Sequence, residues 1–281
     1  MINPAPGRRV AQGAALAPSV RPLTAMDFDL VRDLARDTCG ISLPEAKKAL
    51  VSSRLERLVR HYGFDSFTAY IHFVSRSRHS PEFTEFIDTL TTNHSGFWRE
   101  PEHFVFLQKT VFPLKNRARI WSAACATGEE PYTIAMCAVD AGVQSCSVTA
   151  TDISSAALGA AMRGEYEAPK TAALPTGWPD RYFTAVRTRP AAVLTVAPRV
   201  RALVAFSPLN LLQPFGHLGI FDVIFCRNVM IYFDQETRDR LVESLVAQLP
   251  EGGYLFTGHS ETLLRLPPGL RYVQPATYRR A

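Results

Sequence analysis

The sequence contains no apolar run that reaches the roughly 18 residues expected of a membrane-spanning helix. Arg8 and Arg9 are followed by neither an apolar core nor a small-residue cleavage site, so we expect no secretory signal. The 281 residues, 47% of them hydrophobic and 20% charged, have the composition of a soluble globular protein. We therefore expect a cytoplasmic protein without membrane insertion.

The five cysteines are an odd number, and none of them stands in a Cys-x-x-Cys pair. This pattern disfavours disulfides and zinc, so we predict small buried side chains in a reducing compartment and no metal centre. The net charge is +5, but the sequence lacks the dense stripe of Lys and Arg typical of nucleic-acid binding. The charge is compatible with an acidic protein partner.

The first third of the chain shows helical periodicity after a tail. Residues 1–21 are rich in Ala, Pro and Arg without periodicity, and we expect them to be disordered. Residues 22–90 contain four apolar patterns at helical spacing and predict a small all-helical domain. These patterns begin near Thr24, Ser42, Phe67 and Ser80.

Two of these helices have capping-box spacing at their start. Thr24 and Asp27 open the first helix, and Gly40 ends it. Ser42 and Glu45 are expected to open the second helix. One face of the second helix would then carry apolar residues: Leu50, Val51, Leu55, Leu58 and Tyr62.

From Arg119 onward, short apolar strands alternate with helical stretches. Strands are expected at 119–123, 147–151, 202–206, 221–226 and 253–258, with helices at 130–141, 154–162 and 235–249. This alternation predicts an α/β fold with a mostly parallel sheet covered by helices on both faces. We interpret residues 164–200 as a β-rich inserted subdomain, residues 91–118 as a linker that contacts the ligand, and residues 119–281 as the ligand-binding domain.

Polar residues follow three of the predicted strands. The turn at 123–130 places Glu129 and Glu130 on the first turn of a helix, where a phosphate-binding site would avoid carboxylates. A ligand that is neutral or cationic at this point, such as S-adenosylmethionine, fits better than ATP or NAD. Asp152 closes the second strand, about 20 residues further on, where an acidic residue commonly binds ribose hydroxyls.

Arg227 and Asn228 close the strand at 221–226. Because the carboxyl ends of parallel strands meet at one edge, we expect these strand ends to form one pocket. Simpler roles stay open for each residue. Gly128, a single glycine where the dinucleotide fingerprint has three, would then serve only its turn. Asp152 would only stabilise a helix start, and Arg227 and Asn228 would be surface turn residues.

Five stretches in a fixed order carry a resemblance to a known family. They are residues 91–100, with Asn93, Ser95, Trp98 and Arg99; 122–132, Ser-Ala-Ala-Cys-Ala-Thr-Gly-Glu-Glu-Pro-Tyr; 150–153, Ala-Thr-Asp-Ile; 210–211, Asn-Leu; and 225–233, Phe-Cys-Arg-Asn-Val-Met-Ile-Tyr-Phe. Residues 258–261, Gly-His-Ser-Glu, agree as well. The chain resembles the chemotaxis receptor glutamate O-methyltransferases, the CheR family, from residue 22 to about residue 278.

The resemblance implies a Rossmann-like S-adenosylmethionine-dependent methyltransferase sheet, with the helical domain at its N-terminus. It further implies methyl transfer to glutamate side chains on cytoplasmic helices of chemoreceptors, giving methyl esters and S-adenosylhomocysteine in chemotaxis adaptation. Glutamate has an ordinary pKa near 4.3, so it is an anionic nucleophile at neutral pH without a general base. The enzyme would align the reacting atoms and remove water from the carboxylate.

Nine residues match family positions around the cofactor: Asn93, Ser95, Arg99, Glu130, Asp152, Asn210, Leu211, Arg227 and Asn228. Arg99 is the expected catalytic partner of the acceptor carboxylate, because a guanidinium binds a carboxylate in bidentate fashion. Tyr232 is the second expected catalytic residue and would orient the same carboxylate or contact the sulfonium. In the simpler alternatives Arg99 caps a helix at 101–107 and Tyr232 only packs.

On the second helix, four basic residues fall within one arc: Lys47, Arg54, Arg57 and His61. This arc is either ordinary solvated surface or a docking face for the acidic methylation helices of a receptor. Some family members use the β-rich insert to tether a receptor tail. The absence of glycine between Arg181 and Val200 leaves tethering undecided here.

Two other functions compete with receptor methylation by a monomeric enzyme. One is methylation of another carboxylate or of a small molecule, although no Asn/Asp-Pro-Pro-Tyr motif of an N-methyltransferase follows the strand at 221–226. The other is a catalytically silent adaptor that binds S-adenosylmethionine, and the presence of Arg99 and Tyr232 argues against it.

Overall fold

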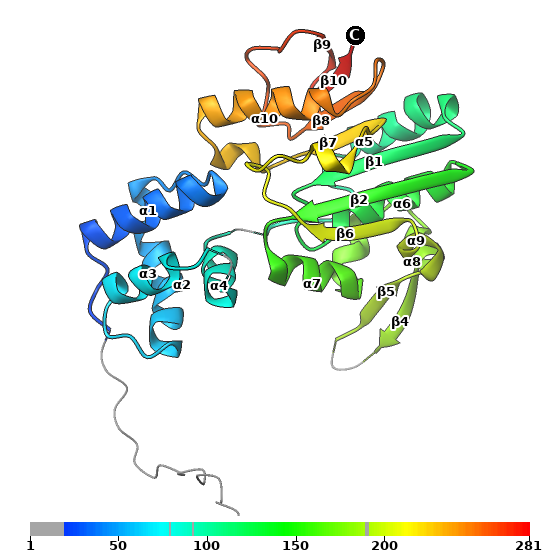
Figure 1. Ribbon diagram of the computed structural model, residues 1–281. Helices are drawn as coiled ribbons and strands as arrows, with labels where there is room; N and C mark the ends of the chain where they lie inside the picture. The colour runs from blue at the N-terminus through cyan, green and yellow to red at the C-terminus, as the bar shows by residue number, and fades with distance from the viewer. Residues whose placement is uncertain (1–19, 79, 92, 189–190) are drawn as a thin grey trace, which may run out of the picture.

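The computed structural model describes residues 20–281 except 79, 92, 189 and 190. The tail expected at 1–21 lies almost entirely outside this described part. The N-terminal helices are α1 (Ala25–Cys39), the 3₁₀ turn η1 (Glu45–Lys47), α2 (Lys48–His61), α3 (Phe67–Ser75) and α4 (Pro81–Leu90). They form a separate layer beside the sheet, with their own apolar core (Figure 1).

The ends of α1 follow the predicted chemistry. Thr24 Oγ1 accepts a hydrogen bond from the Asp27 backbone N–H at 3.1 Å, and the Asp27 carboxylate accepts one from the Thr24 backbone N–H at 2.9 Å. Gly40 ends the helix with φ 75°, a left-handed conformation that glycine adopts without strain. The capping box at Thr24 and the stop at Gly40 are confirmed.

The second predicted capping box is wrong. The helical path begins at Glu45 with Pro44 at the cap position, and no side chain caps it. Ser42 lies two residues earlier, where its backbone N–H donates to the Tyr232 carbonyl at 2.7 Å. The proline holds extended backbone between Ser42 and the helix, so the serine hydroxyl does not reach the first free N–H groups. Leu50, expected inside, is 47% exposed.

The large sheet has the strand order β6-β2-β1-β7-β8-β10-β9. Its parallel part consists of β1 (Arg117–Ala123), β2 (Ser145–Asp152), β6 (Val204–Pro208), β7 (Val223–Cys226) and β8 (Tyr254–Thr257). From β1 the chain proceeds outward to β2 and β6, then returns to β7 on the other side of β1. This reversal between β1 and β7 is the switch point at which doubly wound sheets bind ligands.

Two antiparallel strands complete the sheet: β9 (Leu270–Gln274) and β10 (Thr277–Arg280), the latter pairing with β8. The sequence analysis did not predict this hairpin. Only Leu270 is buried in β9, and the other four residues are exposed or half-buried, so the strand has little apolar alternation to detect. The hairpin forms because β10 pairs with the edge of β8 and β9 pairs with β10. A short stretch of sequence does not indicate such pairing.

Helices before and between the strands cover the sheet. They are α5 (Pro101–Phe106), continued by η2 (Leu107–Val111) and η3 (Phe112–Leu114); α6 (Glu129–Asp140); α7 (Ser155–Arg163); and α10 (Gln235–Ala247), with the 3₁₀ turns η5 (Gly216–Leu218) and η6 (Met230–Tyr232) before α10. Neighbouring side chains of β1 point to opposite faces, so Ile120 packs with α5 and α6 while Trp121 packs with α10.

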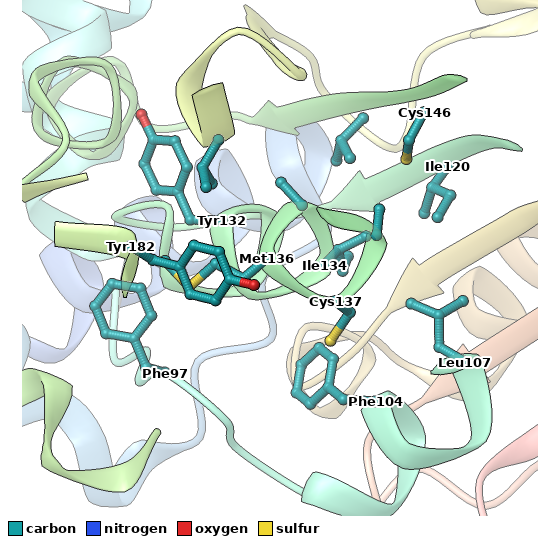
Figure 2. Close-up of a cluster of buried hydrophobic side chains, with 14 of the residues drawn as sticks. Phe97, Phe104, Leu107, Ile120, Tyr132, Ile134, Met136, Cys137, Cys146 and Tyr182 are labelled. Atoms are coloured by element: carbon teal, nitrogen blue, oxygen red, sulfur yellow. The ribbon is translucent and has the colours of Figure 1, made fainter. Parts of the chain in front are cut away.

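Figure 2 shows the core on the α6 face, where Phe104, Leu107, Ile134 and Cys137 meet. Burying one such side chain fully contributes roughly 1.5–3 kcal/mol. All five cysteines are free and buried, as predicted.

The region expected as a β-rich insert forms a second sheet, in the order β3-β5-β4. Its strands are β3 (Glu165–Glu167), β4 (Phe183–Arg187) and β5 (Val193–Val196), accompanied by η4 (Ala168–Ala173), α8 (Trp178–Tyr182) and α9 (Pro198–Arg201). It extends from the main sheet between α7 and β6 (Figure 1). The chain is thus an α/β protein with a helical N-terminal layer and a β-rich insert, as the sequence predicts.

Candidate active site

A pocket of about 1260 Å³, its open mouth included, lies between the helical layer and the carboxyl ends of the parallel strands. The helical side contributes residues from Cys39 to Arg54, and the connecting segment contributes residues from Leu90 to Arg99. The strand ends of β1, β2, β6 and β7 form the other wall. All ten predicted site residues line this one cavity: Asn93, Ser95, Arg99, Glu130, Asp152, Asn210, Leu211, Arg227, Asn228 and Tyr232.

The turn from β1 into α6 has an unusual backbone. Gly128 has φ 93°, and a Cβ there would lie 2.8 Å from the Ala161 Cβ, so both conformation and space require glycine. Ala124 and Ala126, with φ 62° and 47°, hold left-handed conformations that non-glycine residues rarely adopt. Such strain persists where surrounding contacts fix the chain, which is common at ligand sites.

Asp152 fixes this turn. Its carboxylate accepts hydrogen bonds from the backbone N–H groups of Ala126 and Ser154, both at 2.8 Å. Burial raises the pKa of Asp152, although these two hydrogen bonds favour the ionised form. The Ser154 hydroxyl also accepts a hydrogen bond from the Asn93 side-chain amide at 3.2 Å. Asp152 therefore both faces the pocket and connects the β1 turn to the start of α7.

A buried arginine forms the floor of the pocket. The Arg227 side chain is 2% exposed and lies between two carboxylates, 2.9 Å from Glu100 and 3.0 Å from Glu130. Glu130 also accepts a hydrogen bond from the Ser122 hydroxyl at 2.7 Å. Two carboxylates around one guanidinium leave a net negative charge in the floor, which suits a cationic ligand.

The two glutamates respond differently to this setting. Burial raises the pKa of Glu130, against the opposing effects of the Arg227 charge and the Ser122 hydrogen bond. Burial also disfavours the ionised form of Glu100. There, however, the Arg227 charge and hydrogen bonds from Arg227 and Asn228 hold the pKa below its ordinary value.

Arg99 and Tyr232 lie at the pocket wall. The Arg99 guanidinium donates to the His94 carbonyl at 3.3 Å, and no side chain caps α5, so the alternative of Arg99 as a cap for that helix is wrong. The Tyr232 ring packs against the apolar clusters of both layers, and the Lys47 ammonium lies 5.2 Å from its centre. Tyr232 thus packs and faces the pocket at once.

Asn210 uses its side chain to join the two layers. Its amide N–H donates to the Thr38 carbonyl at the end of α1, at 2.6 Å, and its amide oxygen accepts the Leu212 backbone N–H at 3.0 Å. Leu211 follows directly and packs against the core on the α10 side. These contacts set the position of the helical layer over the ends of β2 and β6.

Sequence reasoning assigned no role to two glutamates that shape the site. Glu100 pairs with Arg227, and its other oxygen accepts the Asn228 side-chain amide at 3.2 Å. The Glu261 carboxylate accepts backbone N–H groups from Asn228 at 2.6 Å, Gly258 at 2.7 Å and Ile231 at 3.1 Å. Both residues lie within the motifs quoted above. Apart from Gly258, which is three residues from Glu261, their partners lie 30 or more positions away, so spacing gives little sign of their roles.

Two family models match consecutive parts of this chain. Residues 26–91 match the family described as CheR methyltransferase, all-alpha domain, and residues 93–278 match CheR methyltransferase, SAM binding domain. The chain is 38% identical over 256 residues to a chemotaxis protein methyltransferase of Borreliella burgdorferi, covering 86% of this chain and 89% of the relative. It is 37% identical over 248 residues to that of Escherichia coli strain K12, covering 87% of each.

Among solved structures, the N-methyltransferase NodS from Bradyrhizobium japonicum WM9 in complex with S-adenosyl-L-homocysteine is 16% identical, with a TM-score of 0.36, over 66% of this chain and 70% of that one. In the described part of the chain, no helix combines the length and the apolar character needed to span a bilayer.

The doubly wound sheet with its switch-point pocket, together with the SAM-binding match, defines an S-adenosylmethionine-dependent methyltransferase. The helical layer and the methyltransferase layer match the two models of one family in succession along the chain. The chain belongs to the CheR methyltransferase family and acts in chemotaxis adaptation.

Proposed function

We propose that the enzyme transfers the methyl group of S-adenosylmethionine to glutamate side chains on the cytoplasmic helices of chemoreceptors. The observation that carries this proposal is the separation of charge across the pocket. Glu130, Asp152 and Arg227 line the floor, and Glu100 pairs with Arg227 there, so these carboxylates outnumber the guanidinium. Two other cations line the same pocket from different elements, Lys47 from the helical layer and Arg99 from the connecting segment, and together they form its cationic wall.

This division of charge fits two ligands of opposite sign. The acidic floor suits the sulfonium and amino groups of the cofactor, and Asp152 is the residue that would bind its ribose. The cationic wall suits an anionic acceptor, for which Arg99 supplies up to two parallel N–H donors. S-adenosylmethionine supplies an electrophilic methyl group when bound. Asn93, Ser95, Asn210, Leu211 and Asn228 would complete its binding site.

The reaction needs orientation more than acid–base chemistry. A bond forms from a glutamate oxygen to the methyl carbon as the carbon–sulfur bond breaks, leaving a neutral ester and a neutral thioether. No proton moves, because a glutamate is ionised near pH 7. Two opposite charges disappear in this step, so exclusion of water favours it. Arg99 and Tyr232 would hold the carboxylate in line for attack.

The basic arc on α2 is the proposed docking face for the acidic receptor helices. Lys47 and Arg57 remain available for this role, together with His61. Arg54 is largely committed to structure, because its guanidinium donates to the carbonyls of Thr89, Leu90 and Thr91 at the end of α4, at 3.2–3.5 Å. We expect Arg57→Ala to weaken receptor binding more at low salt than at high salt. We further propose that the enzyme is a monomer and acts in the cytoplasm.

Methyl transfer from labelled S-adenosylmethionine to receptor-containing membranes tests this function. We expect label on the receptor that mild base releases as methanol, which is the behaviour of a glutamyl ester. Label that resists base would contradict the proposal and indicate methylation of nitrogen. Label on a small carboxylate and none on receptors would favour the alternative acceptor.

A further inference from the structure

Beside the pocket floor, three side chains with metal-binding atoms converge: Glu100, His103 and His259. One carboxylate oxygen and one nitrogen of each histidine lie within 4.8 Å of one another. Glu100 and His103 belong to the start of α5, while His259 follows β8, so the cluster joins two distant parts of the chain. The methylation chemistry described above uses neither histidine.

His103 is the unusual member of this cluster. Its side chain is fully buried, and neither ring nitrogen has a hydrogen-bond partner of ordinary geometry among the described residues. The Pro275 carbonyl lies close enough to the ring to favour its protonated form slightly. A buried polar side chain without a full set of partners costs about 1–3 kcal/mol, so it calls for an explanation.

His103 would bind a metal ion through its neutral ring, the form that full burial favours. Its Nδ1 lies 3.6 Å from Glu100 Oε2. Two ligands of one tetrahedral zinc ion are separated by about 3.4 Å, because each lies roughly 2.1 Å from the metal.

The other two members suit the same ion. His259 is 45% exposed, so the cluster is open to solvent on this side and an ion can reach it. Its Nε2 lies 3.9 Å from the Glu102 carboxylate. Glu100, Glu102 and Glu130 together outweigh the nearby Arg227, so the local charge remains negative and accepts a dication.

We propose that Glu100, His103 and His259 form a binding site for a divalent transition-metal ion of the zinc type. Two imidazoles and one carboxylate are ligands that zinc, cobalt and nickel share. The fourth position is open to water or to Glu102. Glu100 also pairs with Arg227, so a bound ion would be coupled to the cofactor pocket. The ion and the cofactor would then change each other's binding affinity by the same factor.

Direct metal binding tests this site independently of methylation. The full chain, prepared without a histidine tag and freed of metal, is titrated with Co²⁺ while its visible absorption is recorded, and with Zn²⁺ by calorimetry. We expect one ion per chain and cobalt bands of a low-coordinate site with imidazole ligands. His259→Ala removes an exposed ligand without disturbing the core, and it should weaken binding at least about tenfold.

His217→Ala is the matched control, because His217 is also exposed but lies outside the cluster. It should bind both ions as the unmodified chain does. Absence of saturable binding would overturn the proposal, and so would equal affinity of His259→Ala and the unmodified chain. Neither result bears on receptor methylation, which is measured separately.

Discussion

The Glu100 carboxylate lies 2.9 Å from the Arg227 guanidinium, although 127 positions separate the two residues in the sequence. This pair connects the segment leading into α5 with the end of β7. Arg99 is the neighbour of Glu100, and Asn228 is the neighbour of Arg227. The ion pair therefore fixes the segment that carries Arg99 against the turn that carries Asn228. The residue proposed to bind the acceptor and those proposed to bind the cofactor therefore keep a fixed relative position.

Arg99→Ala should reduce kcat/KM for the receptor about 100-fold, or about 2.7 kcal/mol of transition-state stabilisation. The interaction lost in this variant would be the proposed charge-assisted pair with the acceptor carboxylate. Initial rates at varied receptor concentration measure this effect. Arg76→Ala, a change of an exposed arginine outside the pocket, is the control and should leave the rates unchanged. Full activity of Arg99→Ala would remove the role given to this side chain.

Asp152→Asn should weaken binding of S-adenosylhomocysteine about tenfold, or about 1.4 kcal/mol. In the native protein the carboxylate accepts hydrogen bonds from two backbone N–H groups. The amide of the variant would place its own N–H donor against one of them, so the turn at Ala126 would lose support. Calorimetric titration with S-adenosylhomocysteine gives the dissociation constant. An unchanged constant would show that Asp152 serves only the local backbone and touches no ligand.

Glu261→Gln should lower the free energy of unfolding by about 2 kcal/mol, because one of three buried N–H donors would face another donor. Urea denaturation followed by circular dichroism measures the loss. Glu251→Gln, at an exposed position before β8, is the matched control with little expected effect. If both variants unfold at the same urea concentration, Glu261 does not brace the turn after β7.

Glu100→Gln should destabilise the protein at neutral pH and much less in acid. The pKa of Glu100 is lowered from 4.5 in the folded protein, so its contribution is complete above 4.5 and is lost as the pH falls through the lower folded value. Urea midpoints of both proteins at pH 7, 5 and 4 test this. A difference that grows on acidification would contradict the pairing of Glu100 with Arg227.

The α/β order was predictable because each parallel strand is a short apolar run and each helix has a periodic face. The capping box at Thr24 was predictable because its partners lie three residues apart. Ser42 shows the limit of such local patterns: the same spacing occurs there, but Pro44 and a hydrogen bond to the distant Tyr232 carbonyl prevent capping. The β9–β10 hairpin was missed because β9 has little apolar alternation of its own. The hairpin depends instead on the pairing of β10 with β8.

The ten candidate site residues could be named because they lie in the stretches that resemble the family, and the structure places all ten around one cavity. Their interactions were not predictable from the same motifs. Asn210 bonds to the Thr38 carbonyl 172 positions away, and Glu261 holds Asn228 from 33 positions away. Such contacts depend on the tertiary fold, and a spacing within the sequence does not encode them.

The most direct test of the central claim is to locate the transferred methyl group on a receptor. The receptor's cytoplasmic fragment is incubated with enzyme and S-adenosylmethionine, digested, and analysed by mass spectrometry, with receptor variants that carry alanine at the modified positions as controls. We predict methyl groups on glutamate side chains, lost in mild base and absent from the alanine variants. Methyl groups on lysine, arginine or amide nitrogen, stable in base, would contradict the claim.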